Sequence, residues 1–396
     1  MKYLFTAAAL LVSLSASAVI QGDGYYRVQN YESGRYIYVL DNKGSLNFQA
    51  TTADLGALEV WTGYDRTISD PATVIYVTDV TGKNTHFDLQ AQGTGVEYMI
   101  ERAVRILKDK KGDFYRVYGE DSGLCRYIGD GTEYESEQGY VSSIQPYSSN
   151  YVKWYFHPIS LDESQYFGVK PTVDANGAHY ASFYASFPFS TASDGMKVWY
   201  VSCVDKKMGV AVVKEIEGTV PAATPVYIEC SSTSASANKL KLGGSASAIS
   251  DNILGGVYFQ NRTISHRNLT TYYPKTMRVL GKTAEGKLGF ITASMDYLPR
   301  NQAYLPVPSD TPAELSIMTE EEYRMAGVVS VDADAVTVKA VGNELVVDGL
   351  ASGMLVEVFN IAGTKVFSGS QTSVQLPSAG LYIVRIGNRA YKIVSR

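Results

Sequence analysis

Short runs of alternating apolar and polar residues, rich in Val, Ile, Tyr and Thr, recur along almost the whole chain. Turns of Gly, Asn, Asp and Ser separate them. This period of two residues is typical of strands. The helical exceptions are short: Val96 to Lys108 fits either a helix or a strand pair, and Thr319 with Glu322 has the capping-box pattern of a helix start. We therefore expect an all-β fold.

The first residues have the pattern of an export signal. Lys2 supplies the positive charge, Leu4 to Val12 is apolar, and Ala16-Ser17-Ala18 is a small-x-small cleavage site. The apolar run is shorter than the roughly 20 residues that a membrane-spanning helix needs, and no later stretch reaches that length. We expect residues 1–18 to be a signal peptide, a mature chain that starts near Val19, and no membrane insertion.

The composition excludes several classes of protein. The chain has 396 residues, which favours two or three domains, and its net charge of −5 with no basic stripe argues against nucleic acid as a partner. Cys125, Cys203 and Cys230 are too few and too far apart for a disulfide framework or a zinc site. A bridge between Cys203 and Cys230 and buried free thiols are both compatible with the sequence. We expect no cofactor and no metal.

Residues 19–160 contain a weak threefold repeat of strand, polar turn, strand, turn and closing strand. The copies read Tyr25–Asn30, Gly34–Val39 and Trp61; then Val74–Asp79 and Thr85–Gln90; then Phe114–Gly119, Gly123–Ile128 and Trp154–Phe156. Units of about 40 residues that cannot bury a face alone can share one core. This arrangement resembles a β-trefoil of the ricin-type lectins. Glu59-Val60-Trp61 and Val152-Lys153-Trp154 stand where that family has Gln-x-Trp, and the second copy has no Trp.

The resemblance implies a binding site for sugar, in which a turn carboxylate or amide holds hydroxyls and an aromatic ring stacks on the pyranose. The matching residues are Tyr38, Asp41 and Asn42 in the first copy and Tyr127 and Asp130 in the third. The 30 tyrosines of the chain suit such stacking surfaces, although strand positions alone account for most of them. Turn-shaping is the competing interpretation for each named residue.

Residues 161–324 form a second β region. Four segments read as strands: Val198–Val201, Gly209–Val213, Pro225–Ile228 and Leu288–Ile291. The stretch from Leu288 to Val307 resembles β-sandwich repeats of large secreted Bacteroidetes proteins. We therefore expect a β-sandwich-like middle domain.

Residues 325–396 read as a run of short strands. Three motifs occur in order: Val358–Gly363, Gly380–Arg385 and Lys392–Val394. They resemble the C-terminal sorting domain of the type IX secretion system, a small Ig-like sandwich. The resemblance implies that the type IX translocon is the partner of residues 325–396 and that the protein is secreted or attached to the cell surface. An ordinary Ig-like module is the alternative.

The sequence lacks the common catalytic patterns. It has no Gly-x-Ser-x-Gly elbow, no phosphate loop, no HExxH and no Cys-x-x-Cys, and Cys203 with His179 is the one imaginable thiol–imidazole pair. We expect Cys203 to be a core residue and the protein not to be an enzyme. The expected function is binding, as an adhesin for a glycan or a host protein. A secreted glycan-degrading enzyme and a non-binding structural surface protein are the alternatives.

Overall fold

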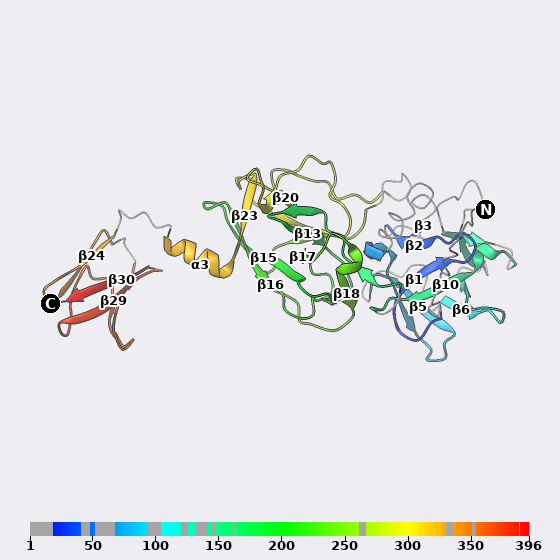
Figure 1. Ribbon diagram of the computed structural model, residues 1–396, viewed down its shortest axis with the longest axis horizontal. Helices are drawn as coiled ribbons and strands as arrows, with labels where there is room; N and C mark the ends of the chain where they lie inside the picture. The colour runs from blue at the N-terminus through cyan, green and yellow to red at the C-terminus, as the bar shows by residue number, and fades with distance from the viewer. Residues whose placement is uncertain are drawn as a thin grey trace, which may run out of the picture. The chain divides into compact units, whose positions relative to one another are not determined.

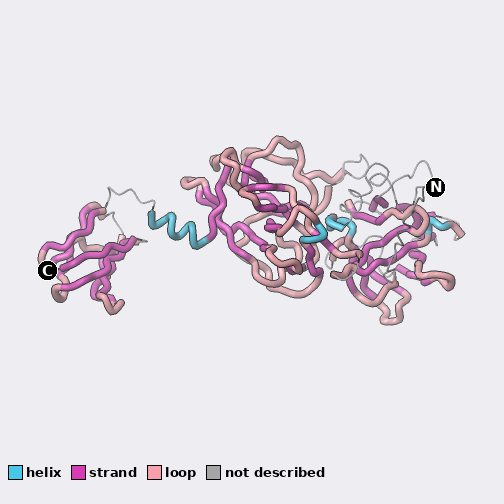
Figure 2. The backbone as a smooth tube through the Cα atoms, viewed as in Figure 1, coloured by secondary structure: helices cyan, strands magenta, loops and turns pink. Residues whose placement is uncertain are grey.

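The computed structural model describes residues 19–40, 48–51, 68–93, 104–119, 126–130, 141–144, 148–161, 164–260, 267–329, 336–350, 354–387 and 389–395. Strands dominate these residues, so the expectation of a mostly β protein is confirmed (Figure 2). The chain divides into two compact units, Met1–Ile317 and Met318–Arg396. The predicted signal peptide lies outside the described residues. Within them, no helix has the length and hydropathy of a transmembrane span.

A closed barrel of six strands forms the first part of the larger unit (Figure 1). Its strands, in order around the barrel, are β1 (Gly24–Asn30), β4 (Ile75–Asp79), β5 (His86–Ala91), β6 (Val104–Lys108), β7 (Tyr115–Gly119) and β10 (Trp154–Pro158). β10 closes the ring, because it pairs with β1 from Asn30↔Trp154 to Tyr26↔Pro158 and with β7 at Trp154↔Tyr115.

Two hairpins extend the barrel. They are β2 (Tyr36–Val39) with β3 (Phe48–Thr51), next to β1, and β8 (Arg126–Asp130) with β9 (Val141–Ile144), next to β7. The first and third sequence copies therefore each supply a barrel strand followed by a hairpin strand. The second copy differs, because both its segments, β4 and β5, are barrel strands. Trp61 of the first copy lies outside the described residues.

The apolar face of each barrel strand points inward, as the period of two residues predicts. Val28, Ile75, Trp154 and Phe156 are among the buried residues of one shared core. The indole Nε1 of Trp154 donates a hydrogen bond of 2.8 Å to the carbonyl oxygen of Ile128. The tryptophan of the third copy is thus part of the core and joins β10 to β8.

The middle region is built on a ten-stranded sheet. Its order is β12 (Val173–Ala175), β13 (Ala178–Phe183), β17 (Val226–Cys230), β15 (Lys197–Asp205), β16 (Val210–Glu215), β23 (Glu314–Thr319), β21 (Leu288–Ile291), β20 (Met277–Lys282), β22 (Gln302–Pro306) and β19 (Gly255–Val257). A three-stranded sheet of β11 (Phe167–Gly168), β18 (Lys239–Leu242) and β14 (Phe189–Thr191) accompanies it. The four predicted strands are present as parts of β15, β16, β17 and β21.

The large sheet curls until strands near its two ends meet. The hydroxyl of Ser182 on β13 donates to the carbonyl oxygen of Ala303 on β22 and accepts from the Ala303 amide, both at 2.8 Å. The amide of Tyr184 donates to the carbonyl oxygen of Asn301 at 2.9 Å. The expected β-sandwich is therefore a curled half-barrel instead. Strand periodicity does not report which strands meet across the ends of a sheet, so the sequence did not distinguish the two architectures.

Two cysteines of this region are free thiols, so the bridge between Cys203 and Cys230 is not formed. Cys230 is buried on β17, in agreement with a core thiol. Cys203 is exposed, which corrects the expectation that it is a core residue. A β-bulge between Val201 and Cys203 shifts the register of β15 against β16. This bulge explains why the Cys203 side chain lies on the exposed face of the strand, although Val201, two residues earlier, is buried. His179 lies opposite Cys230 and pairs with Asp174.

The smaller unit begins with the helix α3 (Glu320–Val329), and the predicted capping box is present. The Thr319 amide donates to the Glu322 carboxylate at 2.7 Å, and the Glu322 amide donates to the Thr319 hydroxyl at 3.2 Å. Two sheets follow and share one core. They are β24 (Thr337–Val341), β25 (Glu344–Asp348) and β28 (Ser373–Gln375), and β27 (Lys365–Gly369), β26 (Val356–Asn360), β29 (Gly380–Ile386) and β30 (Arg389–Ser395).

Candidate ligand-binding site

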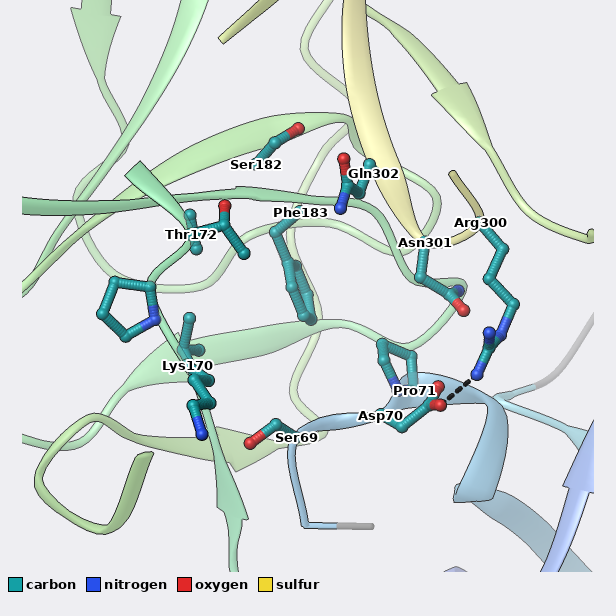
Figure 3. Close-up of a pocket in the computed structure, with 13 residues that line it drawn as sticks. Ser69, Asp70, Pro71, Lys170, Thr172, Ser182, Phe183, Arg300, Asn301 and Gln302 are labelled. Carbon is teal, nitrogen blue, oxygen red and sulfur yellow. Dashed lines mark hydrogen bonds and ion pairs between the residues drawn. The ribbon is translucent and has the colours of Figure 1, made fainter. Parts of the chain in front are cut away.

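A cavity of about 350 Å³ lies within the larger unit, where the segment before β4 meets the curled sheet (Figure 3). Three parts of the chain form it: residues 69–71 from the barrel region, residues 169–172 and 181–183 from the start of the middle region, and residues 300–302 at the start of β22. Its size falls in the range that is usual for small-molecule sites.

The lining combines an apolar floor with a polar rim. The full set of lining residues is Ser69, Asp70, Pro71, Val169, Lys170, Pro171, Thr172, Ala181, Ser182, Phe183, Arg300, Asn301 and Gln302. In Figure 3 the ring of Phe183 lies between the side chains of Lys170 and Thr172 on one side and those of Arg300 and Asp70 on the other. Such a mixture binds ligands that have both an apolar face and several hydrogen-bonding groups.

An ion pair between Asp70 and Arg300 forms one wall of the cavity (Figure 3). Asp70 is also the N-cap of the short 3₁₀ helix Pro71–Thr73, because its carboxylate accepts a hydrogen bond of 3.0 Å from the Ala72 amide. The cap fixes the carboxylate, and the carboxylate fixes the guanidinium. The pair thus joins the barrel region to the curled sheet at the cavity.

Two buried polar atoms beside the cavity have no hydrogen-bond partner within the described structure: the hydroxyl of Ser69 and Oδ1 of Asn301. The amide nitrogen of Asn301 donates to the carbonyl oxygen of Tyr184 at 3.1 Å and to Oε1 of Gln92 at 3.2 Å, which fixes the orientation of the side chain. Buried polar groups are almost always paired, so unpaired ones next to a cavity point to a place for a water molecule or a polar ligand atom.

The charged groups among the described lining residues are Asp70, Lys170 and Arg300, and Asp70 is paired with Arg300. Across the described ranges, no cluster of three His, Cys, Asp or Glu side chains could hold a metal ion. What the lining can do is donate and accept several hydrogen bonds around an apolar ring face.

Three of the residues predicted from the sequence, Tyr38, Tyr127 and Asp130, are described, and they lie elsewhere, on the two hairpins of the barrel. Tyr38 is in β2, and Asp41 and Asn42 lie outside the described residues. Tyr127 on β8 is half-buried and packs against Tyr118, with ring centres 5.3 Å apart.

Asp130 has an interior position at the end of β8. Its side chain is fully buried, and its carboxylate accepts a hydrogen bond of 2.5 Å from the Ser33 hydroxyl and lies 3.5 Å from the guanidinium of Arg35. It therefore ties the hairpin of the third copy to the turn of the first copy. A buried and paired carboxylate is not presented to a ligand at the surface, so we assign Asp130 a structural role in the barrel.

Sequence reasoning missed the cavity because its residues come from segments that are far apart in the chain. One signal was present: the Arg300-Asn301-Gln302 triplet lies inside the stretch singled out between Leu288 and Val307. Asn301 has a positive φ of 55°, which is uncommon for a residue other than glycine and occurs often at functional sites.

Comparisons with known proteins leave the family open. No family model and no curated protein matches the chain. A mosquitocidal holotoxin is similar at 9% identity and a TM-score of 0.25, over 92% of this chain and 53% of that one. PorZ, a surface component of the type IX secretion system of Porphyromonas gingivalis, is similar at 10% identity and a TM-score of 0.14, over 96% and 39%. The chain thus spans about half or less of these proteins, and both scores are too low to support an argument about function.

Proposed function

We propose that this protein is an exported glycan-binding protein, secreted or held at the cell surface, and that the cavity beside Asp70 and Arg300 takes the ligand. The observation that carries the proposal is the cavity itself, with the Phe183 ring and several polar side chains in its lining, and two buried polar atoms beside it that no described residue pairs. Carbohydrate is the ligand class that combines apolar C–H faces with many hydroxyls. A protein ligand, as in an adhesin for a host protein, is the second candidate.

The shape of the site favours binding over the two alternatives. A glycan hydrolase needs two carboxylates on either side of the scissile bond, whereas the described lining residues include one carboxylate, Asp70, which is held by Arg300. A purely structural surface protein has no reason to keep a concave site with unpaired polar atoms. Both points support a binding protein.

The barrel region is, in this proposal, a lectin-like β-trefoil. A β-trefoil combines a six-stranded barrel with three hairpins. The closed six-stranded barrel and its hairpins after the first strands of copies one and three support this interpretation. The turn at Tyr38, Asp41 and Asn42 stays a predicted second contact for a glycan. Tyr127 also stays a candidate contact, whereas Asp130 does not.

Export through the type IX system is the remaining part of the proposal, with residues 325–396 as the segment that the translocon reads. The three motifs fall on β26 and its following turn, on β29 and on β30, three elements of one four-stranded sheet. Because β29 pairs with both β26 and β30, the motifs form one continuous surface. A small sheet with this compact arrangement suits recognition as a folded signal.

A glycan array with the mature chain tests the proposal. The informative variant is Gln302→Ala, because the Gln302 side chain lines the cavity and makes no hydrogen bond to any other described residue. The matched control is Gln371→Ala, an exposed amide in the smaller unit. We expect selective binding that Gln302→Ala weakens at least fivefold and Gln371→Ala leaves unchanged. Failure of the wild-type chain to bind any glycan would contradict the proposal.

A further inference from the structure

A second group of side chains with binding character lies on the barrel, at the turn after β1. The ammonium of Lys153 lies 5.1 Å from the ring centre of Tyr31 and 4.9 Å from that of Phe114. The two rings lie 5.1 Å apart, and Tyr155 on β10 lies 5.7 Å from Tyr31. These four residues, Tyr31, Phe114, Lys153 and Tyr155, are called the Tyr31 platform below.

The backbone holds the platform in place. The Tyr31 amide donates to the carbonyl oxygen of Lys153 at 2.9 Å, so the turn after β1 is tied to the residue that precedes β10. Phe114, directly before β7, is buried and lies against the Lys153 ammonium. Tyr31 is 40% exposed. The platform therefore has a buried base and an open aromatic ring.

Hydrogen-bonding groups surround that ring. The Lys153 ammonium donates one hydrogen bond, of 2.5 Å, to Oδ1 of Asn150, and Asn150 in turn donates to the Glu32 carboxylate at 2.9 Å. An ammonium has three N–H donors, so two remain for a ligand. Within the described structure the hydroxyls of Tyr31 and Tyr155 have no hydrogen-bond partner. Burial, and then the neighbouring Tyr31 and Asp113, raises the pKa of Tyr155, which keeps its hydroxyl protonated as a donor.

We propose that the Tyr31 platform is a second ligand site, for a neutral pyranose. An exposed tyrosine ring stacks on the apolar C–H face of a sugar, and the Lys153 ammonium, the tyrosine hydroxyls and the Glu32 carboxylate hold its hydroxyls as donors and acceptors. The aromatic cluster gathers strands β1, β7 and β10, so the site belongs to the closed barrel. It shares no residue with the cavity.

The charged groups around the platform offset one another. Arg116 lies 5.6 Å from the ring centre of Phe114 and pairs with Asp109, and Lys108 pairs with Asp113. Lys153 and Glu32 both hydrogen-bond to Asn150. Because cations and carboxylates stand together here, an ionic ligand of either sign meets a like charge, whereas a neutral pyranose does not.

Two separate sites in the larger unit have a further consequence. A polysaccharide that reaches both the cavity and the Tyr31 platform is already held at one site when it binds the other. Its overall affinity would therefore exceed the affinity of either site alone. The inference goes beyond the proposed function, because the platform can bind even if the cavity does not.

Saturation-transfer NMR on the mature chain with methyl glucoside, methyl galactoside and methyl mannoside tests the proposal. We expect at least one pyranoside to receive saturation mainly on one ring face, and Tyr31→Ala to reduce that signal at least fivefold. Lys153→Met should reduce it by a smaller factor, because the stacking ring remains. The matched control is Tyr273→Ala, since Tyr273 is 57% exposed in the middle region. A thermal melt checks that each variant is folded.

Gln302→Ala separates this proposal from the proposed function. If the platform is the pyranoside site, this cavity variant leaves the saturation signal unchanged. The proposal is overturned if no pyranoside is saturated. It is equally overturned if the signal survives in Tyr31→Ala, is lost in Tyr273→Ala to the same degree, or is lost in Gln302→Ala alone.

Discussion

The guanidinium of Arg27, fully buried in the barrel, donates a hydrogen bond of 3.1 Å to the carbonyl oxygen of Gln165, which is 138 residues further along the chain. The same side chain donates to the carbonyl oxygens of Tyr166 and Ile68, both at 3.0 Å, and to the hydroxyl of Thr73 at 3.1 Å. Arg27 thus fastens the barrel to the first residues of the middle region and to the segment that enters the cavity. Arg27 therefore helps to fix the position of the cavity, together with the Asp70–Arg300 pair.

Arg27→Met should destabilise the larger unit by about 3 kcal/mol or more. The substitution leaves buried acceptors without a donor, and each such loss costs about 1–3 kcal/mol. Denaturant unfolding of the mature chain measures the change in the free energy of unfolding. Lys241→Met is the control, since Lys241 is exposed on β18. A change below 1 kcal/mol in Arg27→Met would contradict the role assigned to Arg27.

Asp130→Ala should act on stability and not on ligand binding alone. Removing one partner of a buried ion pair costs about 3–5 kcal/mol, because the other charge, on Arg35, stays buried. Asp113→Ala is the matched control, because the Asp113 side chain is 64% exposed and pairs with a solvent-exposed Lys108. If Asp130→Ala leaves the unfolding midpoint at the wild-type value while glycan binding disappears, Asp130 is a ligand-contact residue after all.

His157 should make the protein less stable in mild acid. Burial, and then the charge of Arg27, lowers the pKa of His157 from 6.5 to about 4. Above pH 6.5 the side chain is neutral in both states, and its full contribution to stability is present. As the pH falls from 6.5 to 4, His157 becomes protonated in the unfolded state but stays neutral in the folded state. The free energy of unfolding therefore falls by about 3 kcal/mol.

The test is the free energy of unfolding between pH 7 and pH 4 for the wild type and for His157→Gln. The variant should show a shallower decline, since the difference between the two curves isolates His157 from the carboxylates. Parallel curves would mean that His157 does not carry this dependence.

The two thiols should differ in reactivity. Cys203 is exposed, whereas Cys230 is buried, and burial raises the pKa of the Cys230 thiol to about 12. The thiolate is the reactive form, so a native sample treated with iodoacetamide at pH 8 should be modified at Cys203 and protected at Cys230 until it unfolds. Peptide mass spectrometry reads both sites. Recovery of a peptide that links Cys203 to Cys230 would contradict the free thiols.

The local elements followed from the sequence, because alternation of side chains across a strand is a local property. The segments read as strands at Tyr25–Asn30 and Pro225–Ile228 correspond to β1 and β17, and the capping box at Thr319 starts a helix. What the sequence did not reveal depends on contacts between distant segments. The curl of the middle sheet, the bulge beside Cys203 and the interior place of Asp130 are of this kind.

The candidate site was the hardest part to predict for the same reason. Asp70 and Arg300 are 230 residues apart, and neither belongs to a recognisable motif. The resemblance to lectins directed attention to turns such as the one after Tyr127, where the family carries its sugar site. The structure adds a cavity that arises only when the barrel region and the curled sheet are fastened together.

Hydrogen–deuterium exchange of the mature chain, with and without the glycan that binds best on the array, tests whether the cavity is the ligand site. We expect slower exchange of backbone amides in residues 69–72, 169–172 and 300–302, and loss of this protection in Gln302→Ala. Protection confined to other segments, with residues 169–172 and 300–302 unchanged, would show that the cavity is not the ligand site.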